Sequence, residues 1–101
     1  MTCKQQIFEI VKQIPTKKVA SFGQIGDRVG VRGQVVGWIL SGMKQEEWEL
    51  IPWYRVVAKN GHIASMKLGF KGQLQKEILL QEGYELDQDT VNIEKHRWEM
   101  N

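Results

Sequence analysis

Apolar residues recur every three or four positions in the first part of the chain, and this period predicts helices. The first expected helix spans residues 3–14 and ends before Pro15, because proline cannot continue a helix. Apolar side chains fall on one side of this segment, while charged and amide side chains fall on the other. The apolar positions are Ile7, Phe8, Val11 and Ile14.

Two shorter helices are expected next. Ser21, followed three residues later by Gln24, has the pattern of a capping box, and Gly30 can close that helix in the left-handed conformation. The third helix is expected over residues 33–41. Its core face comprises Val35, Val36, Ile39 and Leu40, and its opposite face comprises Gln34, Trp38 and Ser41. Two short helices joined by a glycine-containing link are typical of a helix-turn-helix, in which the second helix recognises DNA.

The middle of the chain predicts a loop, a stiff turn and a hairpin. Residues 41–50 are rich in charge and are expected to form a loop from which Trp48 packs inward. Pro52 fixes its own φ and holds the following aromatic residues on a turn. The pair Asn60-Gly61 is a strong hairpin signal. We expect a hairpin over residues 55–64, which would be the wing of a winged helix.

The last third of the chain predicts one more helix and an acidic tail. Residues 65–72 lack a clear period and are expected to form a loop, and residues 73–81 have the pattern of a helix. Residues 84–101 form the acidic tail, and Trp98 is expected to dock its end onto the body. The isolated His96 is expected at the surface.

Together these elements predict one domain over residues 1–101, mainly α with a small β-hairpin, in a winged helix-turn-helix fold. Hydrophobic residues make up 42% of the chain, which is enough for a modest core, and no apolar run is long enough to cross a membrane. Cys3 is the single cysteine, so an intramolecular disulfide and a cysteine metal cluster are excluded. We expect a cytoplasmic protein without a cofactor.

The formal net charge is only +2, but the charge is unevenly distributed. Residues 77–101 hold seven acidic residues and two basic ones, so the rest of the chain is clearly basic. A basic body with an acidic tail fits a protein that faces a polyanion. Ordinary surface charge explains the same distribution equally well.

Several motifs are shared with one known family. The chain reads Pro52-Trp53-Tyr54-Arg55-Val56-Val57 and then Gly61-His62-Ile63, and it carries Leu79-Leu80-Gln81-Glu82-Gly83 further on. Upstream it reads Val19-Ala20-Ser21-Phe22-Gly23-Gln24-Ile25. In this order the motifs resemble the DNA-binding domain of the 6-O-alkylguanine-DNA alkyltransferases. Tryptophan in place of the reactive cysteine is the mark of the alkyltransferase-like proteins within that family.

The resemblance implies DNA binding without alkyl transfer. The family arranges a cysteine, a histidine and a glutamate, and the matching positions here hold Trp53, Tyr54 and Glu82. An indole is no nucleophile under these conditions, and a neutral tyrosine is a poor base. Cys3 lies far from this motif and is expected to be inert.

The resemblance also implies a pocket that accepts an alkylated guanine turned out of the duplex. Its expected wall residues are Trp53, Tyr54, Phe22 and Met66. Read without the family, Trp53 is more simply a core residue. The residues expected to support the pocket are Pro52, Arg55 and Glu82, with the arginine bracing the turn.

The expected recognition helix departs from the family at two positions. The family carries an arginine that fills the gap left by the flipped nucleotide, and this chain has Gln34 there, in Gln34-Val35-Val36-Gly37. Glutamine is shorter and uncharged, but it can hydrogen-bond an orphaned base. Phe22 stands where the family usually has tyrosine. Both departures weaken the hypothesis of base flipping and leave that of DNA binding intact.

The other expected DNA contacts are small, basic or capping residues around that helix, and each alone is an ordinary surface or packing residue. They are Arg32, Gly33, Gly37, Trp38, Lys18, Ser21, Lys59, Lys67 and Lys71. In the family the recognition helix enters the minor groove, where readout of sequence is degenerate.

The sequence therefore predicts a non-enzymatic protein that binds 6-O-alkylguanine in duplex DNA and flags it for repair. Its expected partners are alkylated double-stranded DNA and proteins of nucleotide excision repair, and it is expected to be a monomer, at the nucleoid if bacterial. The alternative is a general winged-helix DNA-binding protein or regulator without lesion specificity. An enzyme that uses Cys3 and a protein-interaction module without DNA binding are two further alternatives.

Overall fold

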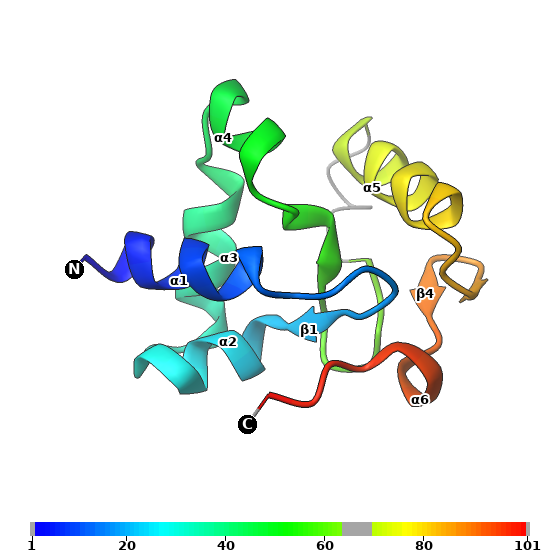
Figure 1. Cartoon of the computed structure of the whole chain (residues 1–101), viewed down its shortest axis with the longest axis horizontal. Coiled ribbons are helices and arrows are strands. Elements are labelled where there is room, and N and C mark those ends of the chain that lie inside the picture. The colour runs from blue at the N-terminus through cyan, green and yellow to red at the C-terminus, as the bar shows by residue number, and fades with distance from the viewer. Residues whose placement is uncertain (1, 64–69, 101) are drawn as a thin grey trace.

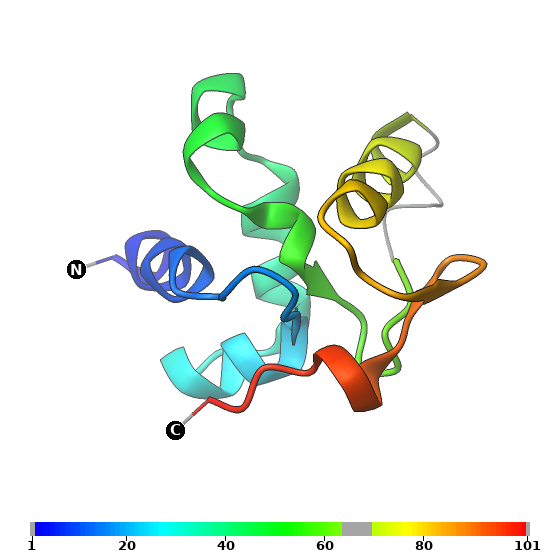
Figure 2. The ribbon, with the colours of Figure 1, turned by 45° about the vertical axis from the view of Figure 1, so that its right-hand side comes forward.

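The computed structural model describes residues 2–63 and 70–100, and within these ranges the fold is mainly helical (Figure 1). The helices are α1 (Cys3–Lys12), α2 (Phe22–Val29), α3 (Gly33–Ser41), α4 (Gln45–Leu50), the 3₁₀-helix η1 (Trp53–Arg55), α5 (Phe70–Gln81) and α6 (Ile93–His96). Helices α1, α2 and α3 pack together on one side of η1, and α5 lies on the other side (Figures 1 and 2). The mainly α fold class is confirmed.

Short strands join the two sides. Strand β1 (Ala20–Ser21) pairs in parallel with β2 (Val56–Val57), and strands β3 (Leu86–Asp87) and β4 (Thr90–Val91) form a small antiparallel hairpin. Val19 also forms a parallel bridge with Arg97. The end of the chain therefore lies along β1 and reaches α2 (Figure 2).

The predicted caps of α2 are confirmed. The Ser21 side chain accepts a hydrogen bond from the Gln24 backbone N–H at 3.0 Å, and the Gln24 side chain accepts one from the Ser21 N–H at 3.0 Å. Gly30 closes the helix with φ of 82°, in the left-handed region where glycine is favoured. The side-chain amide of Gln24 also donates to the Trp98 carbonyl at 2.9 Å, which ties the end of the chain to the start of α2.

The core forms two clusters that meet at η1 and β2. The larger one joins α1, α2 and α3 with η1, and half-buried Trp48 of α4 packs against it. Its buried residues include Ile7, Val11, Ile25, Val36, Leu40, Met43 and Trp53. The smaller one joins β2 and α5 to the C-terminal segment through buried Val19, Val57, Ile63, Leu79, Tyr84 and Val91. Tyr54 packs against both clusters. No helix in the described ranges is long and apolar enough to cross a membrane.

Two predictions about the middle of the chain were wrong. Residues 45–50 form α4 rather than a loop, and the Glu47 side chain accepts from the Lys44 backbone N–H at 2.8 Å, as half of a capping box does. The expected wing ladder over residues 55–64 is also absent from the described part, although the tight turn forms, with Ala58 N–H donating to the His62 carbonyl at 2.9 Å. Strand β2 pairs in parallel with β1, and both of its residues are buried.

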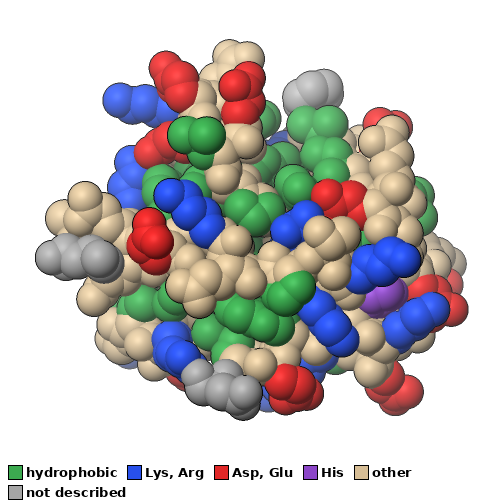
Figure 3. Space-filling model, in the orientation of Figure 1, with side chains coloured by type: hydrophobic (Ala, Val, Ile, Leu, Met, Phe, Trp, Pro, Cys, Tyr) green, Lys and Arg blue, Asp and Glu red, His purple; other side chains and the backbone are tan. Residues whose placement is uncertain are grey.

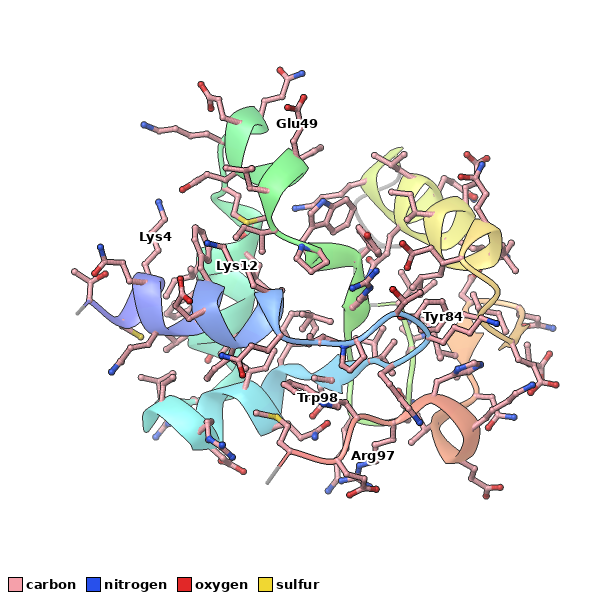
Figure 4. The ribbon with its side chains drawn as sticks, in the orientation of Figure 1. Lys4, Lys12, Glu49, Tyr84, Arg97 and Trp98 are labelled. Carbon is pink, nitrogen blue, oxygen red and sulfur yellow. The ribbon has the colours of Figure 1, made fainter. Side chains whose placement is uncertain are left out.

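Residues 84–100 of the acidic segment are folded onto the body. His96, expected at the surface, is only 3% exposed. Its Nε2 accepts from the Glu85 backbone N–H at 2.9 Å, so the proton sits on Nδ1, which lies 2.8 Å from the Lys17 carbonyl oxygen. Tyr84 adds a hydrogen bond from its hydroxyl to the Lys18 carbonyl at 2.6 Å. Figure 4 shows Tyr84 pointing at the segment between α1 and β1, which contains Lys17 and Lys18, and it shows Trp98 beside α2. The expected docking of Trp98 is therefore confirmed.

We expect His96→Ala to lower the free energy of unfolding by about 2–4 kcal/mol, because it removes two part-buried hydrogen bonds to the backbone and opens a cavity. Urea denaturation followed by circular dichroism measures this change. Lys95→Ala is the matched control, because that side chain is largely exposed in its contact with Glu85, and it should change stability by less than about 0.5 kcal/mol. Equal stability of the two variants would contradict the anchoring role of His96.

Candidate nucleic-acid interface

The exposed face of α3 and the start of α2 bring five predicted DNA-contacting or pocket residues together. Val36 and Leu40 on α3 turn into the core, so the other side of the helix is left at the surface. An open hollow of about 320 Å³ lies there. It is lined by Phe22, Gly33, Gln34, Gly37 and Trp38. The face is largely apolar, and its hydrogen-bonding side chains are the amide of Gln34 and the indole N–H of Trp38.

The two glycines of this face differ in whether the packing of α2 against α3 requires them. A Cβ atom on Gly33 would lie 3.0 Å from the Gly23 backbone nitrogen, so α2 and α3 cross closely only without a side chain there. A Cβ atom on Gly37 would meet only the Phe22 ring, at 3.9 Å, which is ordinary contact. Packing therefore requires Gly33, whereas Gly37 leaves the hollow open without being required by the fold.

A second group forms where η1 meets α4 and α5. Trp53 is 6% exposed, and its ring lies 5.5 Å from that of Trp48 and 5.9 Å from that of Tyr54. The Lys71 ammonium lies 5.0 Å from the Trp48 ring centre and 5.2 Å from that of Trp53, a cation–π arrangement. Burial lowers the pKa of Lys71 below its usual value. Sequence reasoning missed the contact of Trp48 with Trp53, because it placed Trp48 on a loop.

Tyr54, Arg55 and Glu82 form a hydrogen-bonded network beside Trp53. The Tyr54 hydroxyl donates to a Glu82 carboxylate oxygen at 3.1 Å, and Arg55 donates to both oxygens of that carboxylate at 3.2 Å. Arg55 also donates to the Ile14 carbonyl at 2.9 Å. Burial first, and then the hydrogen bond to Glu82, raise the pKa of Tyr54 while the charge of Arg55 partly opposes them. The hydroxyl therefore stays protonated at neutral pH and can donate but cannot serve as a base.

The other predicted positions lie around these two groups. Arg32 is the exposed N-cap of α3, Lys59 is exposed on the tight turn, and Lys18 is half-buried on the connector before β1. Ser21 is occupied in capping α2, and Pro52 begins η1. Met66 and Lys67 lie outside the described residues.

The charges are not gathered into one block on the face drawn in Figure 3, where Lys and Arg alternate with Asp and Glu. Around α3 the sequence is more one-sided. From Arg28 to Gln45 the chain contains basic residues but no Asp or Glu. A surface free of carboxylates can approach a phosphate backbone without like-charge repulsion.

Comparison with known proteins agrees with this geometry. The family model described as "6-O-methylguanine DNA methyltransferase, DNA binding domain" matches residues 2–84. The chain belongs to this family. It is 32% identical over 100 residues to a DNA base-flipping protein of Vibrio parahaemolyticus, with 93% of each chain covered.

A sequence comparison and a structure comparison both find similarity to proteins of the yeast Schizosaccharomyces pombe. The chain is 28% identical over 100 residues to alkyltransferase-like protein 1 of Schizosaccharomyces pombe, covering 92% of this chain and 91% of that one. The crystal structure of S. pombe Atl1 in complex with damaged DNA containing O6-carboxymethylguanine superposes with a TM-score of 0.82 at 26% identity, covering 96% and 94% of the two chains. The similarity thus spans nearly the full length of this chain and of the yeast chains.

The two glycines of α3 provide a test within one helix. We expect Gly33→Ala to destabilise the protein by about 1–3 kcal/mol, because the new methyl group forces α2 and α3 apart. We expect Gly37→Ala to be neutral or to stabilise by up to about 1 kcal/mol, because alanine favours the helix and fits beside Phe22. Chemical denaturation compares the two variants, and the same sign for both would contradict the packing described here.

Arg55 offers a second test of the site. We expect Arg55→Ala to destabilise by about 2–4 kcal/mol, since the arginine is 12% exposed and its loss leaves the Glu82 carboxylate, 24% exposed, without its cation. Arg55→Lys should recover only part of this loss, because an ammonium cannot make the two-pronged contact. Lys12→Ala, which removes an exposed pair with Glu9, is the control and should change stability by less than about 0.5 kcal/mol. Equal losses for Ala and Lys at position 55 would contradict a role for the fork geometry.

Proposed function

We propose that this protein binds 6-O-alkylguanine in duplex DNA, without transferring the alkyl group, and marks the lesion for repair. The observation that carries the proposal is the similarity, over more than nine-tenths of both chains, to Atl1 in complex with damaged DNA. Family membership and the carboxylate-free stretch around α3 support DNA as the ligand.

The absence of alkyl transfer is supported by the residues of η1. Trp53 has no nucleophilic atom, and the protonated Tyr54 hydroxyl is already donated to Glu82. The single thiol, Cys3, begins α1, at the opposite end of the long axis of the molecule from α5 (Figure 1). Among the described residues, no thiol therefore lies near η1 to accept an alkyl group.

The proposed complex has two contact regions. The exposed face of α3 approaches the minor groove, with Gln34 toward the base left unpaired, and Arg32 and Lys59 contact phosphates. The alkylated guanine is received near Trp53, Tyr54 and Lys71. Binding as a monomer then leaves other surfaces free for proteins of nucleotide excision repair.

A second candidate function is general binding of duplex DNA without lesion specificity. The burial of Trp53, which is 6% exposed and packed against Trp48 and Lys71, favours it, because these side chains fill space that a base would need. Gln34 also lacks the length and charge of the arginine that the family carries.

The test is a fluorescence titration of two duplexes that differ by one 6-O-methylguanine, at two salt concentrations. We expect tighter binding to the lesion duplex, and weaker binding to both duplexes at the higher salt concentration because phosphate contacts release counterions. Equal affinity for the two duplexes would favour the second candidate, and affinity independent of salt would contradict both.

Trp53→Phe is the informative variant. Trp53→Ala would remove a core side chain and cost about 3–5 kcal/mol, so lost binding could reflect unfolding. The phenylalanine variant keeps an apolar ring, and we expect it to lose preference for the lesion while retaining affinity for undamaged DNA. As a control for chemistry, the intact mass of wild-type protein should stay unchanged after incubation with the lesion duplex.

A further inference from the structure

Trp38 is a large aromatic side chain that the fold leaves at the surface. It is 63% exposed, whereas Val36 and Leu40 of the same helix are buried. No packing requirement accounts for an indole at this position, since the other side of α3 already supplies the core. Exposure of a side chain this large is costly for a free protein, because it leaves much apolar surface in water.

The neighbours of Trp38 indicate what covers it. Gln34 lies one helical turn earlier on the same face, and Phe22 lies across the hollow of about 320 Å³ that Gly37 leaves open. The whole stretch from Arg28 to Gln45 is free of carboxylates. A surface that is apolar at its centre and basic or neutral around it fits a groove of duplex DNA, where base and sugar edges lie between two rows of phosphates.

We propose that Trp38 is an apolar wedge that enters the minor groove of duplex DNA beside the extruded nucleotide. The inference rests on the proposed function and assigns a task within it that Gln34 cannot perform. Glutamine is uncharged and has no ring, so it hydrogen-bonds an unpaired base but stacks on nothing. An indole presents a flat apolar face, and wedges of this kind partly unstack a base step and bend the duplex.

The helix geometry sets where the wedge acts. One turn of an α-helix advances by about 5.4 Å, and neighbouring base pairs are separated by about 3.4 Å. With α3 lying along the groove, Trp38 meets the duplex one to two base pairs from the position that Gln34 faces. The two side chains divide the work: Gln34 serves the unpaired base, and Trp38 disturbs the adjoining step.

The test compares Trp38→Ala and Trp38→Phe with wild type on the lesion duplex and the undamaged duplex. Base–aromatic stacking predicts that Trp38→Ala weakens binding to the lesion duplex by about tenfold, with Trp38→Phe intermediate. Leu80→Ala is the matched control, because Leu80 is also an exposed large apolar residue, but on α5, and its loss should leave affinity unchanged. Denaturation curves of the variants should match that of wild type, since Trp38 supports no core contact.

A second measurement separates a wedge from an ordinary groove contact. Duplexes carry 2-aminopurine one or two base pairs from the lesion, and its fluorescence reports unstacking at that step. Wild type and Leu80→Ala should change this signal, and Trp38→Ala should not. The wedge would be contradicted if Trp38→Ala bound the lesion duplex as tightly as wild type, or if it changed the 2-aminopurine signal as much as wild type does. The preference of wild type for the lesion duplex is measured separately. If wild type prefers the lesion but Trp38 has no effect, the proposed function stands and the wedge is wrong. If wild type has no preference but Trp38 changes the 2-aminopurine signal, the wedge stands and the proposed function is wrong.

Discussion

The arrangement of η1 depends on one arginine. Arg55 joins three segments that are distant in the sequence: its own turn, the connector after α1 through Ile14 and Thr16, and the end of α5 through Glu82. A guanidinium suits this task because it offers several N–H donors in a fixed plane. Without it, the two core clusters would still bury apolar surface and Gln75 would still donate to the Tyr54 and Val56 carbonyls, but the turn that carries Trp53 would lose its contacts with the segment after α1 and with Glu82.

The C-terminal segment contributes in a different way. Parallel strands as short as β1 and β2 have few hydrogen bonds of their own. The bridge of Val19 to Arg97, with hydrogen bonds from Val19 N–H to the His96 carbonyl and from Trp98 N–H to the Val19 carbonyl, extends this pairing by a third segment. The acidic end of the chain is therefore part of the scaffold, and its charge lies mainly on residues that face water.

Local signals allowed most helices to be predicted, because their causes are local. The caps at Ser21 and Gly30 and the apolar period of α3 each involve residues within a few positions of one another. Helix α4 was missed because it is short and charged, although the spacing of Lys44 and Glu47 carried half of a capping signal. The pairing of β2 and the burial of His96 could not be predicted, since both depend on partners tens of residues away.

The sequence indicated which residues share the outer face of α3, but it did not indicate which pocket residue lies beside them. Gln34 and Trp38 follow from the period of the helix, whereas Phe22, expected at the pocket wall with Trp53, lines the hollow with Gln34 and Trp38. The sequence could not show how tightly Trp53 would be enclosed, since Trp48 reaches it from α4 and Lys71 from α5. Burial of an aromatic ring depends on tertiary packing, which an apolar pattern does not specify.

The residues that differ from the family pattern lie mostly at positions where packing of the core does not require one particular side chain. Tyr54 donates a hydrogen bond to Glu82, so a tyrosine fits the hydrogen-bonded network at this position. Gln34 lies on the solvent side of α3, where the core imposes no size or charge. Trp53 is the exception, because its ring is part of the hydrophobic core and packs against Trp48. The surface of a domain built in this way can change in function by a few substitutions, because Arg55 and the C-terminal segment hold the scaffold in place whichever side chains the turn presents.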